Sequence, residues 1–380
     1  MAKGKKMEIL YEGVLALFQN GGWQRVVMWL IGGLLIYLAI KKDMEPTLLL
    51  PMGFGAIVVN IPQIYEGALS TLFKAGISNE LFPLILFIGI GAMIDFGPIL
   101  TNPKLMIFGA AAQFGIFFTF SLASLFFELP EAASIGIIGA ADGPTAIVVA
   151  QKLLGDSSKI TGAIMVAAYS YMALVPVIQP PIIKLMTTKK ERLIRMPYKA
   201  KEVSKTTRIL FPIIITIIAG LVAPESIDLL GFLMFGNLIR ECGVLNSLSE
   251  TAQKVLANLI TIFLGITVAT QMTADKFLRG ETLLILGLGL FAFIFDTAGG
   301  VMVAKIINVF SKEKINPMIG AAGISAFPMS GRVVHKMGLK EDPQNFLLMH
   351  SIGVNVSGQI ASVIAGGLIL SFASGFGLFG

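Results

Sequence analysis

Residues 132–150 read AASIGIIGAADGPTAIVVA, nineteen residues in which Asp142 is the only charged side chain. A carboxylate at the depth of a bilayer is retained mainly where it faces a cavity, a partner charge or an ion. Pro144 lacks an N–H and leaves the carbonyl of Ala140 without its helical partner, while Gly139 and Gly143 allow the backbone to leave the helix. We therefore predict a broken helix at 139–145, where free carbonyls and Asp142 can bind a cation.

The composition of the whole chain is that of a polytopic membrane protein. It has 380 residues, of which 55% are hydrophobic and 14% charged, far from the balance of soluble domains. Apolar stretches recur along its length without the alternation of a transmembrane β-barrel. Several are shorter than the roughly 20 residues of a full span, so we expect an all-α fold with about nine to eleven membrane segments. The single cysteine, Cys242, excludes an intramolecular disulfide and a cysteine-based metal site.

Two segments outside the apolar core of the sequence can be assigned from their composition. Residues 1–80 are expected to hold an N-terminal amphipathic helix, which lies at the interface or contacts a partner subunit, followed by peripheral spans. Nine Lys or Arg residues lie between Lys184 and Arg208, against two Glu. The positive-inside rule makes 191–206 a basic cytoplasmic loop, which either is simply solvated or forms a docking surface for an acidic partner. Arg332, His335, Lys336 and Lys340 suggest a second cytoplasmic loop.

Two similar strings suggest an internal repeat. Asn102-Pro103 and Asn316-Pro317 are each followed within a few residues by Gly-Ala-Ala; Asp142 lies 40 residues after Asn102, and Asn355 lies 39 residues after Asn316. Such symmetry points to a transporter site, although a chance match of short strings stays open. The prediction is a pair of inverted repeats, 81–190 with a broken segment at 139–145, and 207–380 with a broken segment at 353–359.

The last apolar run supports the second of these breaks. Residues 346–379 contain no Asp, Glu, Lys or Arg, which is too long a run for one ordinary span. Gly353 and Gly358 bracket the polar residue Asn355, and Gln359 follows directly after them. We interpret this segment as a re-entrant or interrupted helix.

Oxygen-bearing side chains in these segments suit a hard cation. Asp142 is the first candidate for a Na+ ligand that exchanges with a proton, with capping of a buried helix end as the alternative. Asn355 and Asn316 can add amide oxygens, although Asn316-Pro317 also reads as an ordinary helix start. Asp296 is the only charge between Leu283 and Ala304. It is either a second cation ligand or a structural hydrogen-bonding group between helices.

Several sequence motifs, which cover most of the chain and occur in the order expected for that family, resemble those of the β subunit of the sodium-translocating, biotin-dependent decarboxylases. That group includes the oxaloacetate, methylmalonyl-CoA and glutaconyl-CoA enzymes. The strings are Gly139 to Thr145, Ala168-Tyr-Ser-Tyr-Met-Ala-Leu-Val-Pro176, Gln179-Pro-Pro181, Asn316-Pro-Met-Ile-Gly-Ala-Ala-Gly-Ile-Ser325, Arg332, Leu347 to His350, and Gly353-Val-Asn-Val356.

The resemblance implies a function and a set of partners. A subunit of this kind decarboxylates carboxybiotin, which a separate carrier protein delivers, and couples CO2 release to Na+ export by alternating access. The expected partners are the biotin carrier protein, the carboxyltransferase α subunit, a small membrane subunit in some members, further copies of this chain and the lipid bilayer, with no nucleic acid. The expected location is the cytoplasmic membrane of a prokaryote, as a multi-pass protein. The chain itself has no Ala-Met-Lys-Met acceptor and no P-loop, so biotin and energy would come from outside.

The resemblance also implies residue roles. Asn316, Gly320 and Ser325 would belong to a shared ion-binding and coupling region, Gly320 through its backbone. Arg332, with a planar fork that suits a carboxylate, would bind carboxybiotin together with Ser325, whereas its spacing alone favours a topogenic arginine. Tyr171 would relay a proton, since loss of CO2 leaves a nitrogen that must be protonated. Without the resemblance, a buried tyrosine with one hydrogen-bond partner is the simpler interpretation.

Two other classes of function fit parts of the sequence. A secondary Na+- or H+-coupled carboxylate transporter explains Asp142 and the repeat equally well. A purely anchoring membrane subunit explains the hydrophobicity but gives no reason for Asp142 and Asp296.

Overall fold

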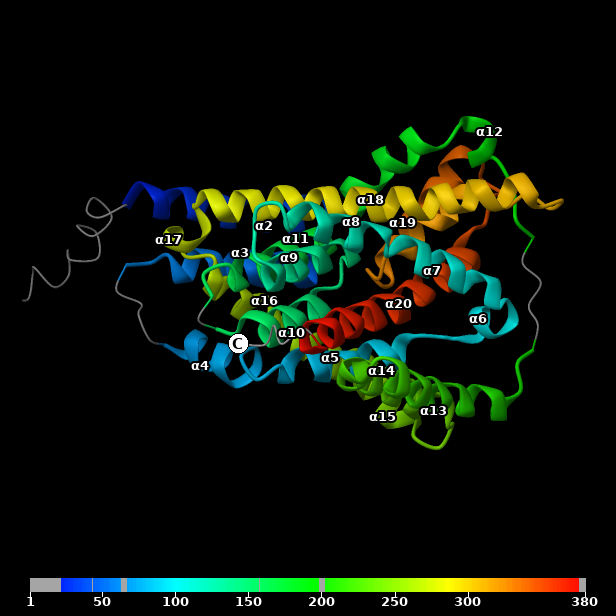
Figure 1. Cartoon of the computed structure of the whole chain (residues 1–380), viewed down its shortest axis with the longest axis horizontal. Helices are drawn as coiled ribbons and strands as arrows, with labels where there is room; N and C mark the ends of the chain where they lie inside the picture. The colour runs from blue at the N-terminus through cyan, green and yellow to red at the C-terminus, as the bar shows by residue number, and fades with distance from the viewer. Residues whose placement is uncertain (1–21, 43, 63–66, 157, 198–201, 376–380) are drawn as a thin grey trace, which may run out of the picture.

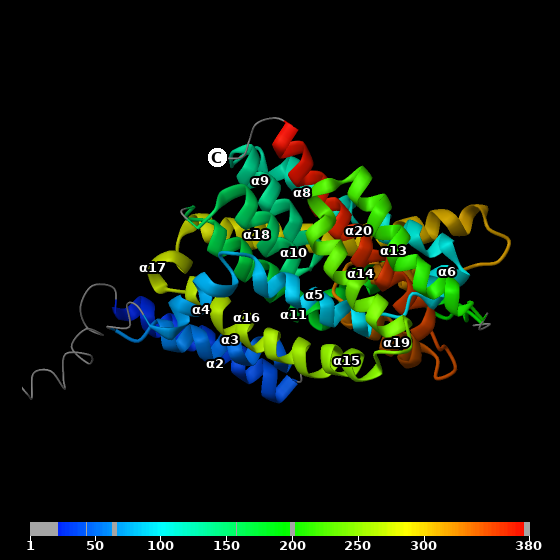
Figure 2. The ribbon, with the colours of Figure 1, turned by 90° about the horizontal axis from the view of Figure 1, so that it is seen from below.

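The computed structural model describes residues 22–42, 44–62, 67–156, 158–197 and 202–375, and these residues form helices with no β-strand (Figure 1). The amphipathic helix expected near the N-terminus lies outside the described residues. Figure 2 shows α2 (Gly22–Lys42) and α3 (Pro46–Val59) on one side, α8 (Phe114–Ala123) and α9 (Leu129–Gly136) on the other, and α10 (Gly143–Leu154) and α11 (Thr161–Met186) between them.

Within the described residues, seven helical stretches are long and apolar enough to cross a membrane. They are α2; Pro103–Ala123, made of η1 (Pro103–Leu105), α7 (Met106–Ala112) and α8; α11; α13 (Lys205–Val222); Asn246–Gln271, made of α15 (Asn246–Glu250), the π-helical η4 (Thr251–Leu256), α16 (Ala257–Val268) and η5 (Ala269–Gln271); α18 (Gly280–Phe310); and α20 (Leu348–Gly375). α4 (Ala68–Gly76) and α5 (Leu81–Met93), bent by 67°, make an eighth if they count as one span. The number is below the expected nine to eleven because apolar stretches such as α3 form helices of only 14 residues.

Shorter elements connect these spans. They are α6 (Gly97–Thr101), η2 (Ile137–Ala140), α12 (Lys189–Arg192), η3 (Pro224–Ser226), α14 (Ile227–Glu241), α17 (Ala274–Phe277), η6 (Pro317–Gly323) and α19 (Met329–Glu341). α19 replaces the second cytoplasmic loop that the basic residues suggested. Its Arg332, Lys336 and Lys340 are spaced four residues apart, so they follow one face of a helix.

The second break lies elsewhere than the sequence indicated. The interruption expected at 353–359 was wrong, because α20 runs as one helix of 28 residues through Gly353 and Gly358. Those glycines serve close packing: a Cβ on Gly358 would overlap the carbonyl of Gly323. The second half is instead interrupted between η6 and α19, at residues 324–328.

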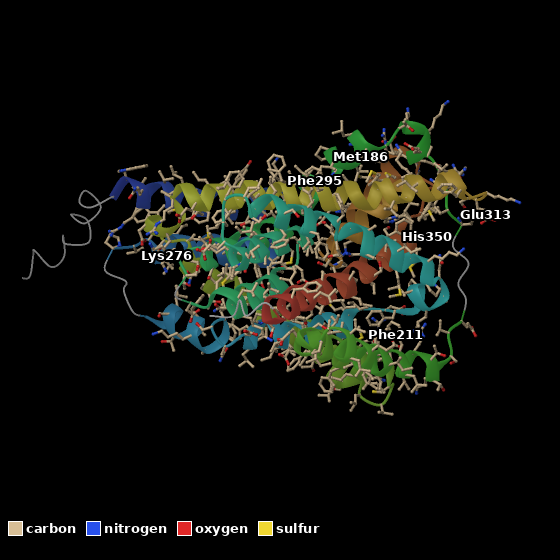
Figure 3. The ribbon with its side chains drawn as sticks, in the orientation of Figure 1. Met186, Phe211, Lys276, Phe295, Glu313 and His350 are labelled. Atoms are coloured by element: carbon tan, nitrogen blue, oxygen red, sulfur yellow. The ribbon has the colours of Figure 1, made fainter. Side chains whose placement is uncertain are left out.

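The order of elements repeats around these two breaks. A 3₁₀ segment, a break, a helix of 12 or 13 residues and a long helix of 26 or 28 residues occur as η2, α10 and α11, and again as η6, α19 and α20. Figure 3 places Met186, at the end of α11, and His350, near the start of α20, toward the same end of the molecule. The two long helices therefore run in opposite directions, and the register pairs Asp142 with the segment 324–328 rather than with Asn355.

The most buried elements surround the first break. Ten of the 12 residues of α10 are buried, whereas only Pro212 and Ala219 are buried among the 18 residues of α13. An apolar helix that exposes most of its side chains suits contact with lipid or another membrane subunit. The core thus lies where α10, α18 and α20 enclose the chain breaks.

Candidate functional site

Asp142 occupies the end of the first break. Ala141 has a left-handed backbone (φ 52°), which turns the chain out of η2, and Asp142 then caps α10 with Pro144 in the first turn. The Thr145 hydroxyl donates to Oδ2 of Asp142 at 2.7 Å, and the Thr145 amide lies 3.5 Å from Oδ1. The carboxylate is held by its own helix start and is only 3% exposed.

One face of α20 reaches both breaks. Gln359 Nε2 donates to Oδ2 of Asp142 at 2.9 Å, and Ser362 Oγ donates to the same oxygen at 3.2 Å. One turn away on that face, Asn355 Nδ2 donates to the carbonyl of Ile324 at 2.7 Å. Continuity of α20, rather than a break in it, places these three side chains in line.

The two interrupted segments contact each other directly. Both the amide and the hydroxyl of Ser325 donate to the carbonyl of Ala140, at 3.0 and 2.6 Å. Ala140 lies two residues before Asp142, and Ser325 follows Ile324, the residue that accepts from Asn355. Asp142, Ser325 and Asn355 therefore belong to one cluster, built from three segments far apart in the sequence.

The cluster is rich in oxygen atoms that can accept a cation. Asp142 Oδ1 has only the long contact with the Thr145 amide, and the buried Oδ1 of Asn355 has no hydrogen-bond partner. Backbone carbonyls of Ala140 and Ile324 lie at the same breaks. The described residues contain no group of three or more His, Cys, Asp or Glu side chains that could hold a metal ion. Carboxylate, amide, hydroxyl and carbonyl oxygens are ligands for a hard cation.

Asp296 lies on the other side of η2. It is fully buried in α18, and the amides of Gly115 and Ile116, at the start of α8, lie beside its carboxylate without hydrogen bonds of ordinary geometry. A Cβ on Gly139 would come within 2.5 Å of its Oδ2, so glycine permits this approach. Its described neighbours are amide donors at a helix start, which suits an anion rather than an extra cation.

The two tyrosines point to different places. The ring of Tyr169 lies against Gly143, next to Asp142. The Tyr171 hydroxyl instead donates to the carbonyl of Leu286, and its ring lies against Gly289 of α18. No hydrogen bond of the described chain links Tyr171 with Asp142.

Asn316 and Gly320 contact other parts of the protein. The amide of Asn316 donates at 2.9 Å to the carbonyls of Arg192 and Ile194, and its Oδ1 accepts from the Met318 amide, so it starts η6 and attaches it to the segment around α12. Gly320 packs backbone to backbone against Gly300 of α18.

Arg332 lines a basic pocket of about 570 Å³ at the end of the molecule that carries α12. We call it the basic pocket; it is lined by Lys42, Met44, Glu45, Pro46, Pro176, Pro180, Lys184, Met329, Arg332, Val333, Lys336, Met337 and Lys340. Five cations against one carboxylate favour an anion, and the prolines and methionines offer apolar surface to a small ring system. Nearby, Arg195 Nε donates to Asp342 Oδ2 at 2.5 Å and lowers the pKa of that carboxyl. A cavity of about 340 Å³ between α8, α9 and α20 has only apolar lining.

Comparison with known proteins identifies the family. Residues 24–373 match the family model described as the Na+-transporting oxaloacetate decarboxylase beta subunit. The chain belongs to this family. It is 45% identical to the oxaloacetate decarboxylase beta chain of Haemophilus ducreyi, with 96% of this chain and 99% of that one covered. It is 48% identical to the methylmalonyl-CoA decarboxylase subunit beta of Propionigenium modestum (91% and 94% covered) and 49% identical to that of Veillonella parvula (92% and 93%).

These relatives agree with the resemblance seen in the sequence. The protein is a β subunit of the Na+-transporting, biotin-dependent decarboxylases, with several membrane spans. The relatives are named as subunits or chains, so the β subunit works in a multisubunit enzyme, and they come from bacteria.

Sequence reasoning missed part of the cluster in the β subunit. Thr145, Gln359 and Ser362 all contact Asp142, yet none was expected there. Spacing offered a signal, because residues 355, 359 and 362 share one face of an unbroken helix. The expected break at 353–359 removed that periodicity from consideration.

Proposed function

We propose that this β subunit binds Na+ at Asp142 and decarboxylates carboxybiotin in the basic pocket, with Na+ exported in return. The observation that carries the ion site is the meeting of two chain breaks beside a buried carboxylate, with Asp142, Ser325 and Asn355 in one cluster. Asn355 Oδ1 has no hydrogen-bond partner and Asp142 Oδ1 has only the long contact with the Thr145 amide, so both are oxygen ligands of the kind that a Na+ ion accepts in place of water.

Asp142 is the exchange group of this proposal. Na+ and a proton compete for one carboxylate, and its Oδ2 already has three donors, which leaves Oδ1 for the ion. The other oxygen ligands near Asp142 in the fold are Oδ1 of Asn355 and the backbone carbonyl of Ala140. Asn316 and Gly320 act on the site through the position of η6. Asp296 lies beside the first amides of α8, and its close approach to Gly139 fixes η2.

The basic pocket suits the second substrate. Bound carboxybiotin supplies an N-carboxylate whose loss as CO2 requires one proton. Arg332 binds the carboxylate through its guanidinium, and the lysines of the pocket raise the local concentration of an anion. Ser325 does not line the basic pocket; it lies in the second chain break, next to the Na+ site. Tyr171 is the proton donor, and its hydroxyl contacts the carbonyl of Leu286 in this structure.

The assembly follows from these two substrates. The end with α12 and α19 faces the cytoplasm of a prokaryotic cell, where a biotin carrier protein and a carboxyltransferase subunit reach the basic pocket. A small membrane subunit and further copies of the β subunit cover apolar faces such as that of α13. Export of one Na+ against 100 mV requires about 2.3 kcal/mol, which decarboxylation provides.

The test uses the purified protein in liposomes. CO2 release from free carboxybiotin and movement of 22Na+ are followed together, in the wild type and in Asp142→Asn. We expect Na+ to stimulate CO2 release in the wild type and to have no effect in the variant, because the amide no longer exchanges a proton with Na+. Gradient-driven Na+ flux without any effect of carboxybiotin would contradict the proposal and favour a secondary transporter.

A further inference from the structure

Gln179 joins three elements beside the basic pocket. It is fully buried on α11, directly before Pro180 and three residues after Pro176, both of which line the pocket. Its Nε2 donates to the carbonyl of Ala321 in η6 at 2.6 Å, and lies 3.3 Å from the hydroxyl of Ser330 in α19. Ser330 donates to the same carbonyl at 3.2 Å. α11, η6 and α19 thus share one buried hydrogen-bond cluster.

This cluster leads toward Asp142. Ala321 lies four residues before Ser325, and Ser325 holds the carbonyl of Ala140 with two hydrogen bonds. Ala140 is two residues from Asp142. A series of hydrogen bonds and short chain segments therefore connects the wall of the basic pocket with the ion site. Contiguity alone is not coupling, which also requires an element that can change position.

α11 can bend at this level. Pro176, Pro180 and Pro181 each lack an N–H, so the carbonyls of the residues four positions earlier lose their helical partners. η6, which Gln179 holds, is a 3₁₀ segment of seven residues that ends at a break, and 3₁₀ runs of this length are uncommon because their hydrogen-bond geometry is poorer than that of an α-helix. A ligand that enters between α11 and α19 meets the prolines of one helix and Arg332 of the other.

We propose that Gln179 is a positioning residue that couples occupation of the basic pocket to the Na+ site. An anion bound between α11 and α19 shifts α11 at its prolines, and Gln179 carries η6 with it. The movement changes the contact of Ser325 with Ala140, beside Asp142. This inference rests on the proposed function, since it requires that the pocket and the ion site serve one reaction.

The experiment measures coupling rather than rate. The complete decarboxylase complex, with wild-type or Gln179→Met β subunit, is placed in liposomes, and 22Na+ transported per CO2 released is determined. We expect this ratio to fall at least about fivefold in Gln179→Met while CO2 release continues, because the two sites no longer act together.

Gln151→Met is the matched control. Gln151 is also buried, donates one side-chain hydrogen bond (2.7 Å, to Asp156) and has an unpartnered amide oxygen, but it lies on α10 and does not line the pocket. Its ratio should equal that of the wild type. An unchanged ratio in Gln179→Met, or a parallel fall of transport and CO2 release at constant ratio, would overturn the inference and leave a packing role.

A second variant covers the case in which Gln179→Met does not assemble. Ser330→Ala removes only a hydroxyl from the cluster, and a smaller fall of the same ratio is expected; no fall would again overturn the inference. Failure of the proposed function looks different, because the wild type itself would then release CO2 without moving Na+.

Discussion

At the scale of single residues, the exposure of a charged side chain decides what it can contribute. Arg332 is exposed on α19 and lines the basic pocket together with four lysines, so its contribution depends on the ligand it meets. A bidentate guanidinium binds a carboxylate more tightly than an ammonium group does. Its role is therefore a question of affinity, in contrast to Asp142, which is buried.

Arg332→Ala should weaken binding of carboxybiotin. A hydrogen bond to a charged group is lost, so we expect KM for free carboxybiotin to rise roughly tenfold or more. Arg332→Lys keeps the positive charge but not the planar guanidinium, so its KM should lie between those of Arg332→Ala and the wild type. Lys190→Ala, at an exposed position of α12 outside the pocket, is the control. Equal KM values for Arg332→Ala and Lys190→Ala would exclude Arg332 from the site.

Asp142 could be identified from the sequence because it is the only charged residue in the nineteen-residue stretch 132–150. Its partners could not be predicted in the same way. Helical spacing places Gln359 and Ser362 on one face of α20, but their contact with Asp142 depends on how α20 packs against α10. The Ser325 contact with Ala140 is likewise a long-range event between two halves of the chain.

At the scale of elements, the chain breaks depend on glycine. η6 crosses α18 so closely that the backbones of Gly320 and Gly300 touch. Gly139 and Gly115 similarly give Asp296 access to η2 and α8. The break after η2 was predictable from Gly143-Pro144, whereas the break at 324–328 is marked only weakly, so the Gly-rich run of α20 was mistaken for it.

Gly320→Ala should destabilise the protein. The added Cβ overlaps the carbonyl of Gly300, and overpacking of this kind costs about 1–3 kcal/mol in the free energy of unfolding. Thermal unfolding in detergent measures the change. Gly287→Ala on α18 is the control, because a Cβ there meets nothing within 4 Å and should be neutral or slightly stabilising. A Tm for Gly320→Ala as high as that of Gly287→Ala would contradict the close crossing.

At the scale of the whole molecule, the basic pocket marks one of the two ends. The basic pocket and α12 lie at one end, and α17 with Lys276 lies at the other (Figures 1 and 3). Composition sufficed to predict a polytopic helical protein, whereas the cytoplasmic side of its basic loop stays a prediction. The alignment of the two repeats could not be predicted from the sequence, because it depends on matching element lengths rather than on the Asn-Pro strings.

Single cysteines should report this arrangement. In a Cys242→Ser background, Lys190→Cys and Lys340→Cys should react with an impermeant maleimide only from the cytoplasmic side, and Lys276→Cys only from the outside. All three lysines are exposed, so access is decided by the membrane. Labelling of Lys276→Cys and Lys340→Cys from the same side would contradict the orientation.

The most direct test of the account is equilibrium binding of 22Na+ to the purified β subunit. Asp142→Asn is compared with the wild type and with Asp296→Asn, which alters the other fully buried membrane carboxylate. We expect Asp142→Asn to lose binding and Asp296→Asn to keep it, because of these two carboxylates only Asp142 lies where the two chain breaks bring oxygen ligands together. Unchanged Na+ binding by Asp142→Asn would show that the ion binds elsewhere.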